Sequence, residues 1–131
     1  MNREIKFRGK HIDSGEWVYG FYLATINPHK IKDSLDTHFI FEGVNIKESI
    51  MVVPESVCQF TGLLDKNGKE IYEGDMLKGS SATGIVMFKN GSWRGSVINS
   101  QWPDWEPMIF PENARCEVIG NIYETPELLQ T

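Results

Sequence analysis

The chain has 131 residues, which is enough for one domain or two very small ones, and its formal net charge at neutral pH is −5. A hydrophobic content of 40% and a charged content of 24% are those of an ordinary globular protein and argue against a disordered chain. The acidic balance disfavours non-specific nucleic-acid binding, because such binding needs cations that neutralise phosphates.

The number of cysteines and the hydropathy of the sequence indicate the cellular compartment. Cys58 and Cys116 are too few for a disulfide framework, so we expect two reduced thiols. The sequence holds no apolar run of about 18 residues, which predicts no spanning helix and no membrane partner. The N-terminal stretch "MNREIKFRGK" lacks the apolar core of a signal peptide. We therefore expect a cytoplasmic protein.

Residues 4–26 predict a β-hairpin. "EIKFRG" alternates apolar and charged residues, and "EWVYGFYLATI" is rich in aromatic and β-branched residues. Between them, Asp13-Ser14-Gly15 is a turn sequence, because Asp and Ser bond the local backbone and glycine tolerates a positive φ. Alternate residues of the second strand fall on one face, namely Trp17, Tyr19, Phe21 and Leu23.

Two more strands are expected before residue 54. "NPHKIKDSLD" has the composition of an exposed connection, and "THFIFEGVNI" and "SIMVV" have that of strands. Pro54 should end the second of these, since proline cannot donate a hydrogen bond to a β-ladder.

The stretch "FTGLLDKNGKEIYEGD", residues 60–75, has the acidic, glycine-rich composition of a ligand loop. An EF-hand loop requires glycine at its sixth position, but counting from Asp65 the glycine is fourth. The spacing instead predicts a β-turn over residues 65–68 that joins strands at 59–64 and 69–72. "EGD" before an apolar stretch resembles the strand entry of SH3-like barrels, so we expect Asp75 to have a backbone-ordering role there.

The remaining sequence predicts another hairpin and a short helical end. Asn90-Gly91 between two strand-like runs is among the strongest hairpin signals. "MIF" and "RCEVIGNIY" supply late strands. In the tail, Thr125, Pro126 and Glu127 have the order of a helix start.

Four segments carry a resemblance in the order in which they occur: "EIKFRGK", "VVPESVCQFTGLLDKNGKEIYEGDMLKG", "GIVMFKNGSW" and "EVIGNIYETPELL". Together they are similar to the YopX family, small proteins encoded by bacteriophages and prophages. The resemblance implies an all-β protein of small β-barrels with an SH3-like C-terminal half and a short C-terminal helical turn. It implies a bacterial cytoplasm as the setting. We expect residues 1–57 to form one barrel-like region and residues 58–131 the SH3-like one.

The resemblance implies no activity and offers no catalytic residues, and the sequence adds none. No histidine lies in a known nucleophile motif, and no stretch has metal-ligand spacing. Glu70, Glu73 and Asp75 could gather for acid–base work, but a solvated or turn-stabilising role is the stronger interpretation. We expect a non-enzymatic protein without cofactor or metal.

Three tryptophans are the main binding candidates: Trp93, Trp102 and Trp105. Such residues either close the core of a small β-domain or form an exposed aromatic patch that binds a partner. Asp104 and Glu106 beside them would repel a phosphate backbone, which favours a protein partner. The leading hypothesis is a phage accessory protein that binds a host or phage protein, or further copies of itself.

Nucleic-acid binding is the alternative function. Residues 1–10 carry four basic residues and one acidic residue, which makes a local basic patch. Its members are Arg3, Lys6, Arg8 and Lys10.

Overall fold

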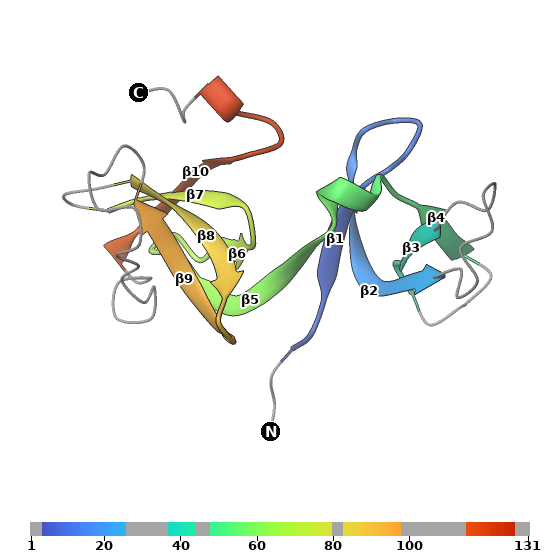
Figure 1. The fold of residues 1–131 in the computed structure, drawn as a ribbon, viewed down its shortest axis with the longest axis horizontal. Coiled ribbons are helices and arrows are strands. Elements are labelled where there is room, and N and C mark those ends of the chain that lie inside the picture. Colours follow the sequence, from blue (N-terminus) through green and yellow to red (C-terminus); the bar gives the residue numbers. More distant parts are fainter. Residues whose placement is uncertain (1–3, 26–36, 44–47, 80–82, 98–114, 128–131) are drawn as a thin grey trace. The chain divides into compact units, whose positions relative to one another are not determined.

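The structure is a computed structural model that describes residues 4–25, 37–43, 48–79, 83–97 and 115–127. The fold is all-β, as expected, and its strands form two antiparallel sheets. The chain divides into two compact units, Met1–Gln59 and Phe60–Thr131 (Figure 1). Closed barrels were a wrong expectation, because neither sheet closes on itself among the residues that the structure describes. Within the described part of the chain, the six-stranded sheet ends at β4 (Ser49–Met51) and β6 (Glu70–Tyr72), and the four-stranded sheet ends at β9 (Ser92–Val97) and β10 (Glu117–Asn121).

The first unit is a meander whose neighbouring strands are antiparallel. Its strands are β1 (Phe7–Lys10), β2 (Trp17–Thr25), β3 (Thr37–Phe41) and β4 (Ser49–Met51). The predicted turn between β1 and β2 is present, and the His11 ring holds it: Nδ1 accepts hydrogen bonds from the backbone N–H of Asp13 and Ser14. Gly15 has a φ of 72°, which confirms the need for glycine there. After β4, a 3-10 helix, η2 (Pro54–Ser56), turns the chain.

Strand β2 changes its partner halfway along its length. Residues 17–20 pair with β1, whereas residues 21–25 pair with β3. The change falls at Gly20, whose φ of 156° is essentially restricted to glycine. A Cβ atom at this position would lie 2.0 Å from the carbonyl oxygen of Phe41. The absence of a side chain therefore allows β3 to join β2 where β1 leaves it.

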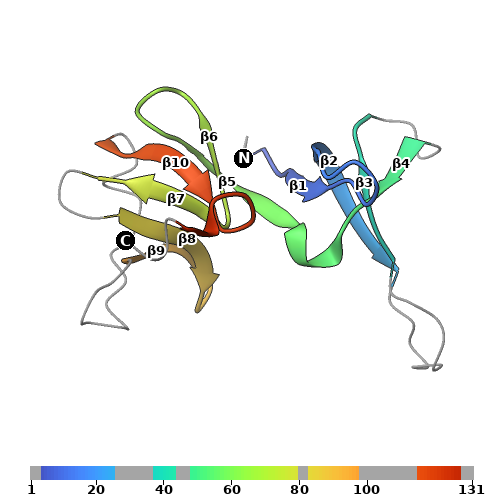
Figure 2. The ribbon, with the colours of Figure 1, turned by 90° about the horizontal axis from the view of Figure 1, so that it is seen from above.

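The second unit combines a hairpin with a four-stranded sheet in the order β10-β7-β8-β9 (Figure 2). Its strands are β6 (Glu70–Tyr72), β7 (Asp75–Lys78), β8 (Thr83–Lys89), β9 (Ser92–Val97) and β10 (Glu117–Asn121). The predicted Asn90-Gly91 turn joins β8 to β9, and both residues have positive φ, as a type I′ turn requires. Pro126 and Glu127 begin a 3-10 turn. The predicted strand "MIF" lies outside the described residues.

Strand β5 (Cys58–Leu64) belongs to both units. Its first residues, Cys58 and Gln59, pair with β1, and its later residues pair with β6 through Phe60 and Leu64. The expected boundary between residues 57 and 58 lies at the start of this strand.

Each unit has its own hydrophobic core. In the first, the buried side chains are Val18, Ile40 and Val52; in the second, they are Ile71, Leu77, Val86 and Cys116. On the core side of the first sheet, the Tyr22 hydroxyl hydrogen bonds to Nδ1 of His38, and burial raises the pKa of Tyr22. Both cysteines are buried and neither is in a disulfide, as the sequence predicted.

We predict that Gly20→Ala lowers the free energy of unfolding by about 2–4 kcal/mol, because the new Cβ meets the Phe41 carbonyl and the backbone conformation excludes a side chain. Gly43→Ala is the control, since a Cβ there meets nothing within 4 Å. Urea denaturation of both variants tests this, and equal stability of the two would contradict the described path of β2.

Candidate binding face

The outward side of the first sheet carries a continuous set of apolar side chains. Alternation along β2 places Tyr19, Phe21 and Leu23 on this side, opposite the core residues Val18 and Tyr22. Directly paired residues of antiparallel strands share a face, so Phe41 lies beside Phe21, Phe39 beside Leu23, and Met51 beside Phe39. We call this set the β2 face; its members are Tyr19, Phe21, Leu23, Phe39, Phe41 and Met51.

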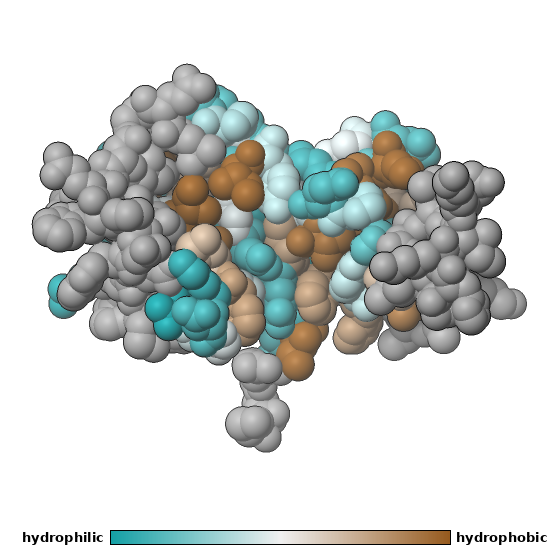
Figure 3. Space-filling model, in the orientation of Figure 1, coloured by the Kyte–Doolittle hydropathy of each residue, from teal (hydrophilic) through white to brown (hydrophobic). Residues whose placement is uncertain are grey.

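The β2 face is exposed. Phe21 has 63% of its surface open to solvent, Leu23 51%, Tyr19 43% and Met51 40%, while Phe39 and Phe41 are partly buried. Apolar surface is also visible on the side of the molecule drawn in Figure 3. Single exposed apolar residues are ordinary, but neighbouring ones on three adjacent strands form a patch of the kind that marks interaction sites.

Two cations adjoin the β2 face at the Tyr19 end. Arg8 pairs with Tyr19 and Lys10 with Trp17 across the β1–β2 ladder, so all four side chains are on the outward side. The Arg8 guanidinium carbon lies 4.3 Å from the centre of the Trp17 ring, and the Lys10 ammonium lies 4.7 Å from it. These cation–π contacts hold positive charge beside the apolar patch.

The basic residues of the N-terminal segment are in different environments. Arg8 is only 6% exposed. Lys6 lies 3.4 Å from Glu4, and Lys10 is partly buried against Trp17. Arg3 lies outside the described residues. The described members therefore do not form one open cationic surface.

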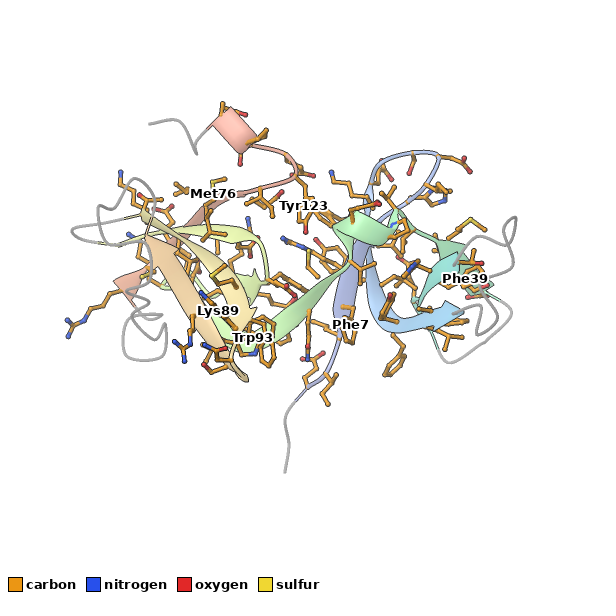
Figure 4. All side chains as sticks on the ribbon, in the orientation of Figure 1. Phe7, Phe39, Met76, Lys89, Trp93 and Tyr123 are labelled. Atoms are coloured by element: carbon orange, nitrogen blue, oxygen red, sulfur yellow. The ribbon has the colours of Figure 1, made fainter. Side chains whose placement is uncertain are left out.

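Trp93 packs against the core of the second unit. It is partly buried beside the buried cluster of that unit and makes an edge contact with Phe88 at 5.0 Å between ring centres. Figure 4 shows Trp93 and Lys89 at the turn end of the β8–β9 hairpin. Trp102 and Trp105 lie outside the described part of the chain, so their role as a binding patch stays a prediction.

The acidic stretch at residues 60–75 is a hairpin, as the spacing predicted. The turn is closed by a hydrogen bond of 3.0 Å from the Gly68 N–H to the Asp65 carbonyl. The Asp65 N–H donates a second one, of 2.8 Å, to the Lys69 carbonyl. The Asp65 side chain, 6% exposed, accepts two further backbone hydrogen bonds with Oδ1, from Asn67 at 2.8 Å and from Lys69 at 2.9 Å. Its Oδ2 accepts a third from Val118 at 3.0 Å, which ties β10 to the turn.

These contacts set the ionisation of Asp65. Burial by itself raises the pKa of this carboxyl, but hydrogen bonds from the N–H groups of Val118, Lys69 and Asn67 outweigh it, aided by the charge of Lys69. The pKa consequently lies below its ordinary value. The carboxylate is a structural tie between turn and strand.

The other acidic candidates also bond locally. Asp75, 1% exposed, accepts a hydrogen bond from the Tyr72 N–H at 2.8 Å, which agrees with its expected backbone-ordering role. Glu70 accepts one from the Tyr72 hydroxyl at 3.3 Å. Within the described ranges, no three His, Cys, Asp or Glu side chains are placed to hold a metal ion. In the same part of the chain, no helix is long and apolar enough to cross a membrane.

Sequence reasoning did not identify the β2 face as a candidate site, although its signal was present. Strand "WVYGFYLAT" is apolar at both odd and even positions, whereas a strand with one solvated face alternates apolar with polar residues. An apolar pattern on both sides predicts either burial on both sides or an exposed apolar face. Only the structure shows that β2 has the second arrangement.

Comparison with known proteins identifies the family. The YopX family model, described as "YopX protein", matches residues 6–130, nearly the whole chain. The chain belongs to the YopX family. No curated protein matches the sequence. Among solved structures, the crystal structure of protein EF1440 from Enterococcus faecalis is similar, with a TM-score of 0.54 and 24% identity, covering 96% of this chain and 98% of that one. At 24% identity, the similarity between this YopX protein and EF1440 shows a shared fold and nothing about function.

We predict that Asp65→Asn lowers the free energy of unfolding by about 1–3 kcal/mol at pH 7, because the amide cannot accept all three backbone hydrogen bonds. The wild-type carboxylate has a lowered pKa in the folded state, so its contribution is complete above the unfolded value of about 3.9. That contribution disappears as the pH falls through the folded pKa.

The difference in stability between wild type and Asp65→Asn should therefore shrink below about pH 4. Urea denaturation at pH 7, 5, 4 and 3 measures it. Asp13→Asn, at an exposed turn position, is the control for the substitution itself and should match wild type at pH 7. A constant difference for Asp65→Asn across this range would show that ionisation of Asp65 is not responsible.

Proposed function

We propose that this YopX protein is a phage or prophage accessory protein that acts in the cytoplasm of a bacterial host by binding another protein, without catalysis. The observation that supports binding is the β2 face, an apolar surface of adjacent strands left open to solvent. Apolar surface of this kind is costly in water, and burial against a partner removes that cost.

The buried carboxylates of the second unit have structural contacts. The buried carboxylates Asp65 and Asp75 both bond to backbone N–H groups, which is the usual chemistry of turn and strand ends. Asp65 has a lowered pKa, whereas a carboxyl that acts as a general acid needs a raised one. The binding proposal needs neither residue.

The finer fold assignment belongs to the same proposal. We take the second unit to be SH3-like, since it combines the β5–β6 hairpin, a four-stranded antiparallel sheet and a 3-10 turn after β10. The proposed binding does not use the peptide groove of SH3 domains, because the β2 face lies in the other unit.

We expect a photo-crosslinking amino acid at position 21 to form adducts with a protein in phage-infected host cells, because Phe21 is the most exposed member of the β2 face. The same amino acid at position 88 is the control, since Phe88 is also an exposed phenylalanine but lies in β8. Leu23→Ser in the background of the position-21 probe should abolish the adduct, with gel shift and mass spectrometry as the measurement. Equal adducts at both positions, or adducts at neither, would exclude the β2 face as the binding surface.

A further inference from the structure

The same tripeptide, Lys-Asn-Gly, occurs at two exposed turns of the second unit. Residues 66–68 lie in the turn between β5 and β6, and residues 89–91 lie at the turn between β8 and β9. The asparagine and the glycine are exposed in both turns. Because the local sequences are alike, any difference between the two asparagines in chemical reactivity must come from the fold.

An asparagine that precedes a glycine can lose ammonia without an enzyme. The backbone nitrogen of the glycine attacks the side-chain amide carbon, a carbon–nitrogen bond forms, and ammonia leaves with the proton that this nitrogen gives up. Water then opens the resulting five-membered succinimide ring at either carbonyl and leaves aspartate or isoaspartate. Glycine favours the attack, because it has no side chain to shield its nitrogen and its backbone rotates freely.

The turn at Asn67 restrains the attacking nitrogen. The Gly68 N–H donates a hydrogen bond of 3.0 Å to the Asp65 carbonyl. The Asp65 carboxylate accepts further hydrogen bonds from the N–H groups on either side, those of Asn67 at 2.8 Å and Lys69 at 2.9 Å. Rotation of the Gly68 nitrogen toward the Asn67 side chain therefore breaks several hydrogen bonds at once, which makes the reactive geometry rare.

The turn at Asn90 is closed without the corresponding nitrogen. In a two-residue hairpin loop the closing pair is formed by the flanking residues, here Lys89 and Ser92, so the Gly91 nitrogen takes no part in it. Asn90 also has a φ of 52°, in the left-handed region that is unfavourable for a residue with a side chain. Local opening at this end of the hairpin relieves that strain and leaves the rest of the β8–β9 ladder paired.

We infer that Asn90 is a site of spontaneous deamidation, and that Asn67, in the same tripeptide, is protected by the turn that Asp65 holds. The inference is independent of the proposed binding function, because the β2 face lies in the other unit.

Deamidation at position 90 has a structural consequence. Isoaspartate carries the backbone through the former side-chain carbon, which adds one methylene group to the loop. A type I′ turn fits two residues of ordinary length, so the end of the hairpin should loosen. The neighbouring contact between Phe88 and Trp93, with 5.0 Å between ring centres, should weaken with it.

Incubation of the full-length protein at pH 8 and 37 °C, followed by tandem mass spectrometry of its peptides, tests the inference. Deamidation should be at least tenfold faster at Asn90 than at Asn67 in the folded protein, because the second turn must break more hydrogen bonds to react. In 8 M urea the two rates should agree within about twofold, because unfolding removes the hydrogen bonds that distinguish the turns.

Two variants separate the contributions of the turns. Asn90→Gly retains a Gly-Gly pair, which also suits a type I′ turn, and should abolish the mass gain at this position. Asp65→Ala removes the carboxylate and should accelerate deamidation at Asn67 while the rate at Asn90 stays unchanged. The Trp93 indole N–H signal in NMR spectra should shift as wild type ages and should stay constant in Asn90→Gly.

Equal rates in the folded protein, or a faster rate at Asn67, would overturn the inference. A rate ratio that is the same in urea would overturn it as well, because the cause would then be the local sequence and not the fold. An unchanged rate at Asn67 in Asp65→Ala would contradict the protection by Asp65.

Discussion

The first unit depends on the missing side chain at Gly20. Because no Cβ is present, the carbonyl of Phe41 approaches the backbone of β2, and the strand passes from its pairing with β1 to its pairing with β3. This exchange lets one nine-residue strand contribute to the core with Val18 and Tyr22 and to the β2 face with Tyr19, Phe21 and Leu23. A larger residue at this position would prevent β3 from joining β2 here, so one continuous strand could no longer contribute to both the core and the β2 face.

In the second unit, the buried carboxylate of Asp65 holds two parts of the chain together. Asp65 closes its own turn and also accepts a hydrogen bond from Val118, a residue far away in the sequence. The Lys66 N–H donates to the Cys116 carbonyl, and the Lys66 ammonium lies 3.8 Å from Glu117. One short turn thus holds the strand that ends the sheet, which explains why an acidic, glycine-rich sequence is structural here.

Local sequence signals predicted the elements well because turn chemistry is local. The geometry of each predicted turn is encoded in consecutive residues: Asp13–Gly15, Asp65–Gly68 and Asn90-Gly91. The structure confirms the hairpins that contain these turns. Whether the sheets close into barrels could not be predicted from local signals, because closure depends on which strand edges meet in space. The family resemblance supplied the barrel expectation, and the open sheets of the described residues correct it.

The candidate site was predictable only in part. The tryptophans stood out by residue type, but Trp93 packs on a core, which no local pattern states. The apolar residues of β2 were recognised as one face, yet burial depends on what the rest of the chain lays against that face. Similarly, the basic N-terminal residues form a patch in the sequence, while in the fold Arg8 is buried and stacks on Trp17.

Strand β5 has a consequence for how this protein could be divided. Cys58 and Gln59 complete the ladder beside β1, and the next residues of the same strand build the hairpin of the second unit. The chain therefore cannot be divided in a loop between domains, because the boundary between the two units falls inside a hydrogen-bonded strand. Fragments meant to represent each half would have to overlap through residues 58–64, and gene rearrangements that exchange one half for another would have to preserve this strand.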